Sequence, residues 1–212
     1  MAIITRDQAV INLKKYIGQD LRRLAKLYGI TTFETGKQNK GWKGLVLERL
    51  AGLKPGNVKA PNGDTFELKS VAFHEVDGDF VPKETMAIGM INPEELKRTP
   101  FFKSHFWFKL RSLILCAVAW HGKNAQKAEL LKVVSFDFFD SDDLIKELAS
   151  DYEYIRNKLI QHGFESLKGE DGKWIQARTK GAGHGSNTRA FYARTDFLKR
   201  IMIENREASG DV

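Results

Sequence analysis

Residues 57–73, NVKAPNGDTFELKSVAF, decide the fold class of this chain. The pair Asn62–Gly63 is a strong signal for a two-residue turn, because both residue types tolerate positive φ angles. The runs on either side, NVKAP and TFELKSVAF, have the composition of short strands. We therefore expect an antiparallel β-hairpin here.

The segment before this hairpin has a helical period. Apolar residues recur at steps of three and four and predict one amphipathic helix over residues 5–28, which could start with a capping box from Thr5 to Gln8. Residues 31–41, TTFETGKQNKG, are polar and contain glycine, so we expect a loop. A second, shorter helix is expected over about residues 41–50.

The segment after the hairpin alternates between strand and helix patterns. We expect strands at 84–91, 112–120, 129–139, 174–180 and 189–194, helices at 104–112, 141–163 and 195–204, and a flexible loop at 181–188. A doubly wound fold would need helical crossovers between parallel strands, but the sequence predicts hairpins at those places. We therefore predict an α/β fold with a central mixed β-sheet flanked by helices, in a single domain covering residues 1–212.

Composition narrows the function classes. The chain has 212 residues, a net charge of +7 and a pI near 9.4, which favours a polyanionic partner such as nucleic acid. Its one cysteine, Cys116, excludes an internal disulfide and a Cys-rich zinc site, and we expect it to be buried. No apolar run approaches the roughly 20 residues that a membrane span needs, and no signal peptide is recognisable, so we expect a cytoplasmic protein.

Candidate chemistry is concentrated in the strand TFELKS. Glu67 and Lys69 are two residues apart, so both side chains should leave the same face, while Phe66 and Leu68 point into the core. A carboxylate beside an ammonium suits metal-dependent hydrolysis of a phosphodiester, with Mg²⁺ held by oxygen ligands. Asp64 offers a second carboxylate, but it needs a bulge or an irregular start of the strand to reach the same side. The alternative is an exposed strand face with paired charges.

Several short blocks, in order, resemble the MutH family of nicking endonucleases, with gaps, over residues 39–200. They are NKGWKGLVLERLAG, GDTFELKS, KETMAIGM, SHFWFKLRSLIL, IQARTKGAG and RAFYARTDFLKRI. The tract GAGHGSNTRAFYAR also resembles the end of the monomeric restriction endonucleases MvaI and BcnI, of the same PD-(D/E)xK superfamily. The resemblance implies a restriction-endonuclease-like fold, with a catalytic core at about 39–140 and a DNA-contacting part at about 141–204.

The resemblance also implies an active site. The family's helical glutamate falls on Glu48, its metal-binding aspartate on Asp64, its E-x-K pair on Glu67 and Lys69, and its additional lysine on Lys109. One or two Mg²⁺ ions would be bound by the three acidic residues. The separation of Asp64 from Glu67 is shorter than in the family. From the residues alone, Glu48 could be a salt-bridged surface residue, and Lys109 could extend outward from an apolar segment.

A second set of residues is expected to bind DNA. Arg178 and Lys180 alternate on one strand face and resemble the family's R-P-K block, where either cation can bind a guanine edge or a phosphate. His184 lies in the glycine-bearing loop, where it could reach a DNA groove or a phosphate. The alternative is a surface histidine without a function. Tyr192 matches a DNA-facing tyrosine of the family or merely packs, and positive charge nearby comes from Arg189 and Arg194.

Together these features indicate a sequence-specific, Mg²⁺-dependent endonuclease of double-stranded DNA. Our first interpretation is a type II restriction enzyme that cuts both strands. The alternatives are a nicking endonuclease of mismatch repair, which would have repair proteins as partners, and a DNA-binding module without catalytic activity.

Overall fold

The computed structural model describes residues 4–34, 37–39, 41–53, 66–121, 127–138, 142–180 and 188–208. The chain forms two compact units. The first contains residues 1–84 and 112–136, and the second contains residues 85–111 and 137–212. Both units combine helices with a sheet, so the predicted α/β class is confirmed. The expectation of a single domain stays a prediction.

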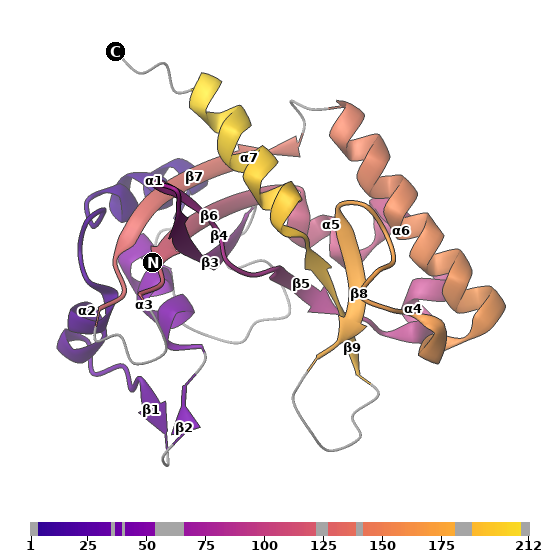
Figure 1. Ribbon diagram of the computed structural model, residues 1–212, viewed down its shortest axis with the longest axis horizontal. Coiled ribbons are helices and arrows are strands. Elements are labelled where there is room, and N and C mark those ends of the chain that lie inside the picture. Colours follow the sequence, from indigo (N-terminus) through magenta and orange to yellow (C-terminus); the bar gives the residue numbers. More distant parts are fainter. Residues whose placement is uncertain are drawn as a thin grey trace. The chain divides into compact units, whose positions relative to one another are not determined.

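The first unit is built on a four-stranded sheet in the order β4-β3-β6-β7 (Figure 1). Strand β3 pairs antiparallel with β4 and parallel with β6, so the sheet is mixed, as predicted. A parallel pair cannot be joined by a tight turn, and the chain passes through the second unit between these two strands. The strands are β3 (Glu67–Val76), β4 (Asp79–Pro82), β6 (Ser112–Ala119) and β7 (Leu130–Asp137).

Helix α3, Trp42–Ala51, belongs to the core of the first unit and confirms the second predicted helix. Its apolar residues pack with alternate residues of β3 and β6, as the period of two in a strand requires. The core also contains residues of α1 (Arg6–Lys14) and α2 (Leu21–Leu27). Its members include Leu13, Leu21, Trp42, Val46, Leu47, Phe66, Leu68, Ile114 and Cys116.

The helix predicted over residues 5–28 is wrong in one respect, since it is divided into α1 and α2. Gly18 has a φ of 82°, which a continuing right-handed helix does not allow. The N–H of Gly18 donates to the carbonyl of Leu130 at 2.8 Å. Asp20 then caps α2 by accepting from the N–H of Arg22, and it also accepts from the N–H of Ala128. Contacts with a distant segment therefore break an otherwise continuous apolar pattern.

The predicted hairpin turn at Asn62–Gly63 lies outside the described residues. The described hairpin joins β3 to β4 through Asp77 and Gly78, with φ angles of 53° and 88°. Asp-Gly is as strong a turn signal as Asn-Gly, so the turn between β3 and β4 was also predictable from the sequence. The predicted loop at 31–41 also contains a short antiparallel pair, β1 (Phe33–Glu34) with β2 (Lys37–Gln38).

The described residues of the second unit form an antiparallel sheet in the order β5-β9-β8 and four α-helices. Every strand and helix that we predicted for this unit is present. The short helix α4 was not predicted, although its Asn92 cap and Pro93 are start signals. No helix among the described residues is long and apolar enough to cross a membrane. The elements are β5 (Met86–Met90), α4 (Pro93–Arg98), α5 (His105–Leu110), α6 (Asp142–His162), β8 (Ile175–Thr179), β9 (Arg189–Ala193) and α7 (Thr195–Ala208).

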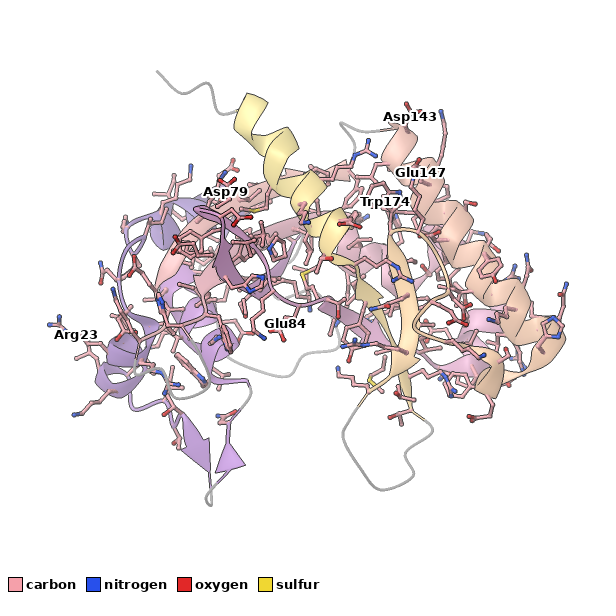
Figure 2. All side chains as sticks on the ribbon, viewed as in Figure 1. Arg23, Asp79, Glu84, Asp143, Glu147 and Trp174 are labelled. Carbon is pink, nitrogen blue, oxygen red and sulfur yellow. The ribbon has the colours of Figure 1, made fainter. Side chains whose placement is uncertain are left out.

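Buried carboxylates and aromatic rings hold the second unit together. The ring centroid of Phe191 lies 4.8 Å from that of Phe106, and each of the two lies 5.6 Å from that of Tyr152. Asp151 on α6 is buried and accepts hydrogen bonds from three successive backbone N–H groups, those of residues 173–175. Also on α6, Glu147 accepts a hydrogen bond from the indole of Trp174 (Figure 2). These contacts fix the chain where it enters β8.

Candidate active site

Glu67 and Lys69 form an ion pair at the start of β3. The Nζ atom of Lys69 lies 2.5 Å from the Oε1 atom of Glu67. Only 4% of the Glu67 side chain is exposed, against 20% of that of Lys69. Two residues apart on one strand, they share a face, as predicted. The pair therefore presents a shielded carboxylate whose charged neighbour reaches solvent.

The opposite face of the same strand is apolar. Phe66 and Leu68 are buried in the core beside α3, which confirms the predicted division between the two faces of β3. On the charged face, Glu67 lies in register with Leu113 of β6, and Leu113 is itself buried. A carboxylate in such surroundings is costly unless a cation compensates for its lost hydration. Lys69 provides that compensation.

Glu48 lies on α3, the helix whose apolar side packs with Phe66 and Leu68 in the core. Its side chain is half-buried, and its Oε2 atom is shielded from solvent. Glu67 leaves β3 on the face opposite to Phe66. A shared cation therefore requires the Glu48 carboxylate to reach past the start of the strand, and its role as a metal ligand stays a prediction.

The chemistry of these groups fits Mg²⁺. This ion prefers carboxylate oxygens and usually takes only one or two of them, with water completing the shell. Among the described residues no group of three or more His, Cys, Asp or Glu side chains could hold a metal. Asp64, the expected second ligand, lies outside the described residues. Glu67 is the best-defined candidate ligand, with Glu48 and Asp64 as predicted partners.

Lys109, the additional lysine of the prediction, belongs to the second unit. It lies near the end of α5 and is half-buried. Its neighbours Phe106 and Trp107 are buried in the aromatic core, so the helix is held firmly by its apolar side. A catalytic role for Lys109 stays a prediction.

The predicted DNA-binding residues divide into two groups. Arg178 and Lys180 are exposed, and the guanidinium of Arg178 lies over the ring of Tyr192, 4.3 Å from its centroid. Tyr192 is 9% exposed and packs beneath this arginine. These three residues occupy the paired strands β8 and β9 and the position just after β8. His184 lies outside the described residues.

Arg189 and Arg194 differ from the expectation that they add accessible positive charge. Arg189 is buried and donates to the carbonyl oxygens of Leu167 and Glu165. Arg194 donates to the carbonyl oxygens of Gly169, Asp171 and Gly172. Both guanidinium groups are used to hold the chain segment that precedes β8, so we leave them out of the interface proposed below.

Two cations near the first unit's sheet were not identified from the sequence. The Nη1 atom of Arg6 donates to Ser112 Oγ at 2.8 Å, which brings a guanidinium to the start of β6, one residue before the register partner of Glu67. Lys43 on α3 is largely buried, and this burial lowers its pKa although Glu84 opposes the shift. Neither residue has a local sequence signal, because distant segments create both environments.

Comparison with known proteins agrees with this geometry. A family model described as "DNA mismatch repair enzyme MutH" matches residues 59–147, which include Glu67, Lys69 and Lys109. Escherichia coli (strain K12) MutH is 27% identical over 195 residues, covering 90% of this chain and 82% of that protein. MutH of E. coli O17:K52:H18 is 25% identical over 193 residues, with the same coverage. These similarities support a relationship with the MutH-like members of the PD-(D/E)xK endonuclease superfamily.

This relationship confirms the family resemblance found in the sequence blocks. Both relatives are described as "DNA mismatch repair protein MutH". The similarity therefore supports a MutH-like endonuclease. The matched region spans the charged strand β3 and the helix that carries Lys109, and it ends in α6.

Proposed function

We propose that this chain is a Mg²⁺-dependent endonuclease that nicks one strand of double-stranded DNA. This choice replaces the type II restriction enzyme of our first interpretation. The relatives reported above are mismatch-repair proteins and cover most of the chain, which favours the nicking alternative. The same relatives suggest mismatch-repair proteins as partners.

The observation that carries the proposal is the Glu67–Lys69 pair. An ion pair on an ordinary strand surface lies in water and contributes about 0–1 kcal/mol. Here the carboxylate is almost fully shielded and stands next to buried leucines of β6. A charged carboxylate in such shielded surroundings lowers the stability of the fold. A binding or catalytic role for Glu67 explains why the charge is present.

The reaction is hydrolysis of a phosphodiester. A water oxygen forms a bond to phosphorus, the bond from phosphorus to the 3′ oxygen breaks, and that oxygen gains a proton. The products carry a 5′-phosphate and a 3′-hydroxyl. When bound, Mg²⁺ supplies charge neutralisation at the phosphate and increases the acidity of a bound water.

The residues of β3 have complementary tasks. Glu67 provides an oxygen ligand in a shielded position, where electrostatic interactions are stronger than in water. The Lys69 ammonium neutralises this carboxylate in the absence of a cation. Because part of Lys69 is exposed, its three N–H donors can reorient toward the attacking water or a phosphate oxygen. Lys69 thus orients the nucleophile beside the site of Glu67.

DNA binding is proposed for Arg178 and Lys180 of the second unit. Both are exposed at the end of β8, and the net charge of +7 attracts a polyanion over longer distances. Lys180 remains paired to the neighbouring strand, because its N–H donates to the carbonyl of Thr188 at 3.0 Å. A fixed backbone presents the two cations to DNA with little loss of entropy.

Incubation with supercoiled plasmid and Mg²⁺ tests the function. We expect open circles, formed faster in plasmid that carries a recognition site, and no reaction in EDTA. Linear fragments of fixed size would instead support the restriction enzyme. Binding without cleavage at any Mg²⁺ concentration would contradict both and support an inactive DNA-binding module.

A further inference from the structure

The first unit contains a large groove beside α2, with no part in the proposed chemistry. It has a volume of about 1070 Å³, and we call it the α2 groove. Its lining residues come from the corner between α1 and α2, from α2 itself and from the segment before β7. This volume is slightly above the roughly 300–1,000 Å³ of small-molecule pockets.

Part of the lining of the groove is apolar and aromatic. Leu27 is the last residue of α2 and is 73% exposed, an unusually high value for a leucine on an ordered helix. Tyr16 and Tyr28 lie beside it, joined by a side-chain hydrogen bond, and Leu24 anchors the same helix in the core. Burial and this hydrogen bond raise the pKa of Tyr28. The rings are therefore preorganised, while Leu27 is left for a partner to cover.

Three of the lining residues are basic, namely Arg23, Lys26 and Lys127. Arg23 and Lys26 lie on the exposed side of α2, four residues and one residue before Leu27, and Arg23 points away from the helix (Figure 2). Neither forms an ion pair among the described residues. Lys127 is paired with Glu129 at 2.5 Å. The acidic residue of the lining, Asp20, accepts hydrogen bonds from two backbone N–H groups and is already in use as a helix cap.

From this arrangement we infer that the α2 groove binds an acidic amphipathic segment of a protein partner. An apolar side chain of that segment would cover Leu27, and carboxylates beside it would pair with Arg23 and Lys26. DNA fits less well, because a phosphate backbone has no apolar side chain to cover Leu27. Isolated exposed apolar residues are common, but one that lines a groove together with two tyrosines and basic side chains is typical of a peptide-binding surface.

The test uses a phage-displayed library of random peptides of about 16 residues, which is long enough for four helical turns. The whole protein is presented with saturating duplex oligonucleotide, so that surfaces that bind DNA are occupied. We expect selected peptides to combine leucine or phenylalanine with aspartate or glutamate. A failure to enrich peptides above the starting library, or selection of basic peptides, would overturn the inference.

Variants then locate the binding of one selected peptide, made synthetically. Leu27→Glu and the pair Arg23→Glu with Lys26→Glu should each weaken it by about tenfold or more. Matched controls on α6, Ile160→Glu and Lys146→Glu, change an exposed apolar residue and an exposed lysine and should leave the affinity within about twofold. If Leu27→Glu fails to fold, Leu27→Ser takes its place in the binding measurement. Equal binding by the wild type and the folded groove variants would contradict the inference.

Measurements of plasmid nicking and DNA affinity in the same variants distinguish a failure of this inference from a failure of the proposed function. Plasmid nicking and affinity for duplex DNA should be unchanged in Leu27→Ser, since the groove lies outside the catalytic strand. Arg23→Glu with Lys26→Glu lowers the net charge from +7 to +3, so it should weaken DNA binding only through long-range attraction, which added salt screens. If this double variant still lowers DNA affinity at high salt while peptide binding persists, the surface is a nucleic-acid contact and the inference fails. Loss of nicking in the Glu67 variant described below, by contrast, bears only on the proposed function.

Discussion

At the scale of single residues, environment decides what each charged group can do. Glu67 and Glu147 are both ion-paired glutamates, but 4% of the first side chain and 38% of the second is exposed. Hydrogen bonds from Lys173 and Trp174 lower the pKa of Glu147, which is the behaviour of a structural surface pair. The shielded pair at Glu67 costs more to maintain and offers an ion a preformed ligand.

Cys116 tests the packing of the sheet that carries the site. Complete burial raises the pKa of its thiol to about 12. We expect a thiol reagent at pH 8.5 to modify the native protein far more slowly than the unfolded protein, because the reactive form is the thiolate. Above pH 9 the unfolded thiol ionises while the folded one stays protonated, so the free energy of unfolding should fall as pH rises from 9 toward 12.

Cys116→Ala is the control and should remove the thiol's share of that fall, leaving the share of Tyr28 and Tyr152, whose pKa values are also raised. Rapid labelling of native protein would contradict the burial of β6 and with it the shielding of the neighbouring strand.

At the scale of elements, local patterns predicted which segments are helices or strands but not how distant segments alter them. The period of α6 is readable from the sequence, and so is the glycine that follows it. That residue, Gly163, has a φ of 80°. The break between α1 and α2 depends on Asp20 accepting a hydrogen bond from Ala128, 108 residues away. No window of neighbouring residues contains that information.

Gly172 and Gly163 provide a matched pair of variants for the second unit. Both have a φ near 80°, but a Cβ at Gly172 would lie 2.2 Å from the carbonyl oxygen of Ile175, and one at Gly163 would meet no atom within 4 Å. Gly163→Ala should lower the free energy of unfolding by about 2 kcal/mol, the cost of a Cβ on a backbone with a φ of 80° and a ψ of 171°. Gly172→Ala should cost about 3 kcal/mol or more, because the chain beside Asp151 must also move.

Urea unfolding monitored by circular dichroism measures both values. Equal effects of the two substitutions would show that the tight turn before β8 is not formed as described.

At the scale of the whole molecule, the fold decides which basic residues are available to bind DNA. Sequence reasoning identified Arg178, Lys180, Arg189 and Arg194 alike as basic residues of one region, yet the last two donate to backbone carbonyls within the fold. The face of β3 that carries Glu67 and Lys69 followed from the period of a strand. The role of each arginine could not be predicted in this way, because it depends on which backbone carbonyl groups lie near the side chain in the folded chain.

The salt dependence of DNA binding tests the two basic residues that stay exposed. Replacing both Arg178 and Lys180 by alanine should reduce the slope of log affinity against log salt by about 2 if both contact phosphates. Lys146→Ala, a change of an exposed lysine on α6, should leave the slope unaltered. An unchanged slope in the double variant would remove both residues from the proposed interface, or limit them to contacts with base edges.

The most direct test of the central claim compares DNA cleavage with DNA binding in Glu67→Gln, a substitution that keeps shape and removes charge. We predict that the variant binds duplex DNA within about twofold of the wild type and nicks plasmid at least about a hundredfold more slowly at saturating Mg²⁺. Nicking at the wild-type rate by a folded Glu67→Gln variant would contradict the assignment of this carboxylate to the active site.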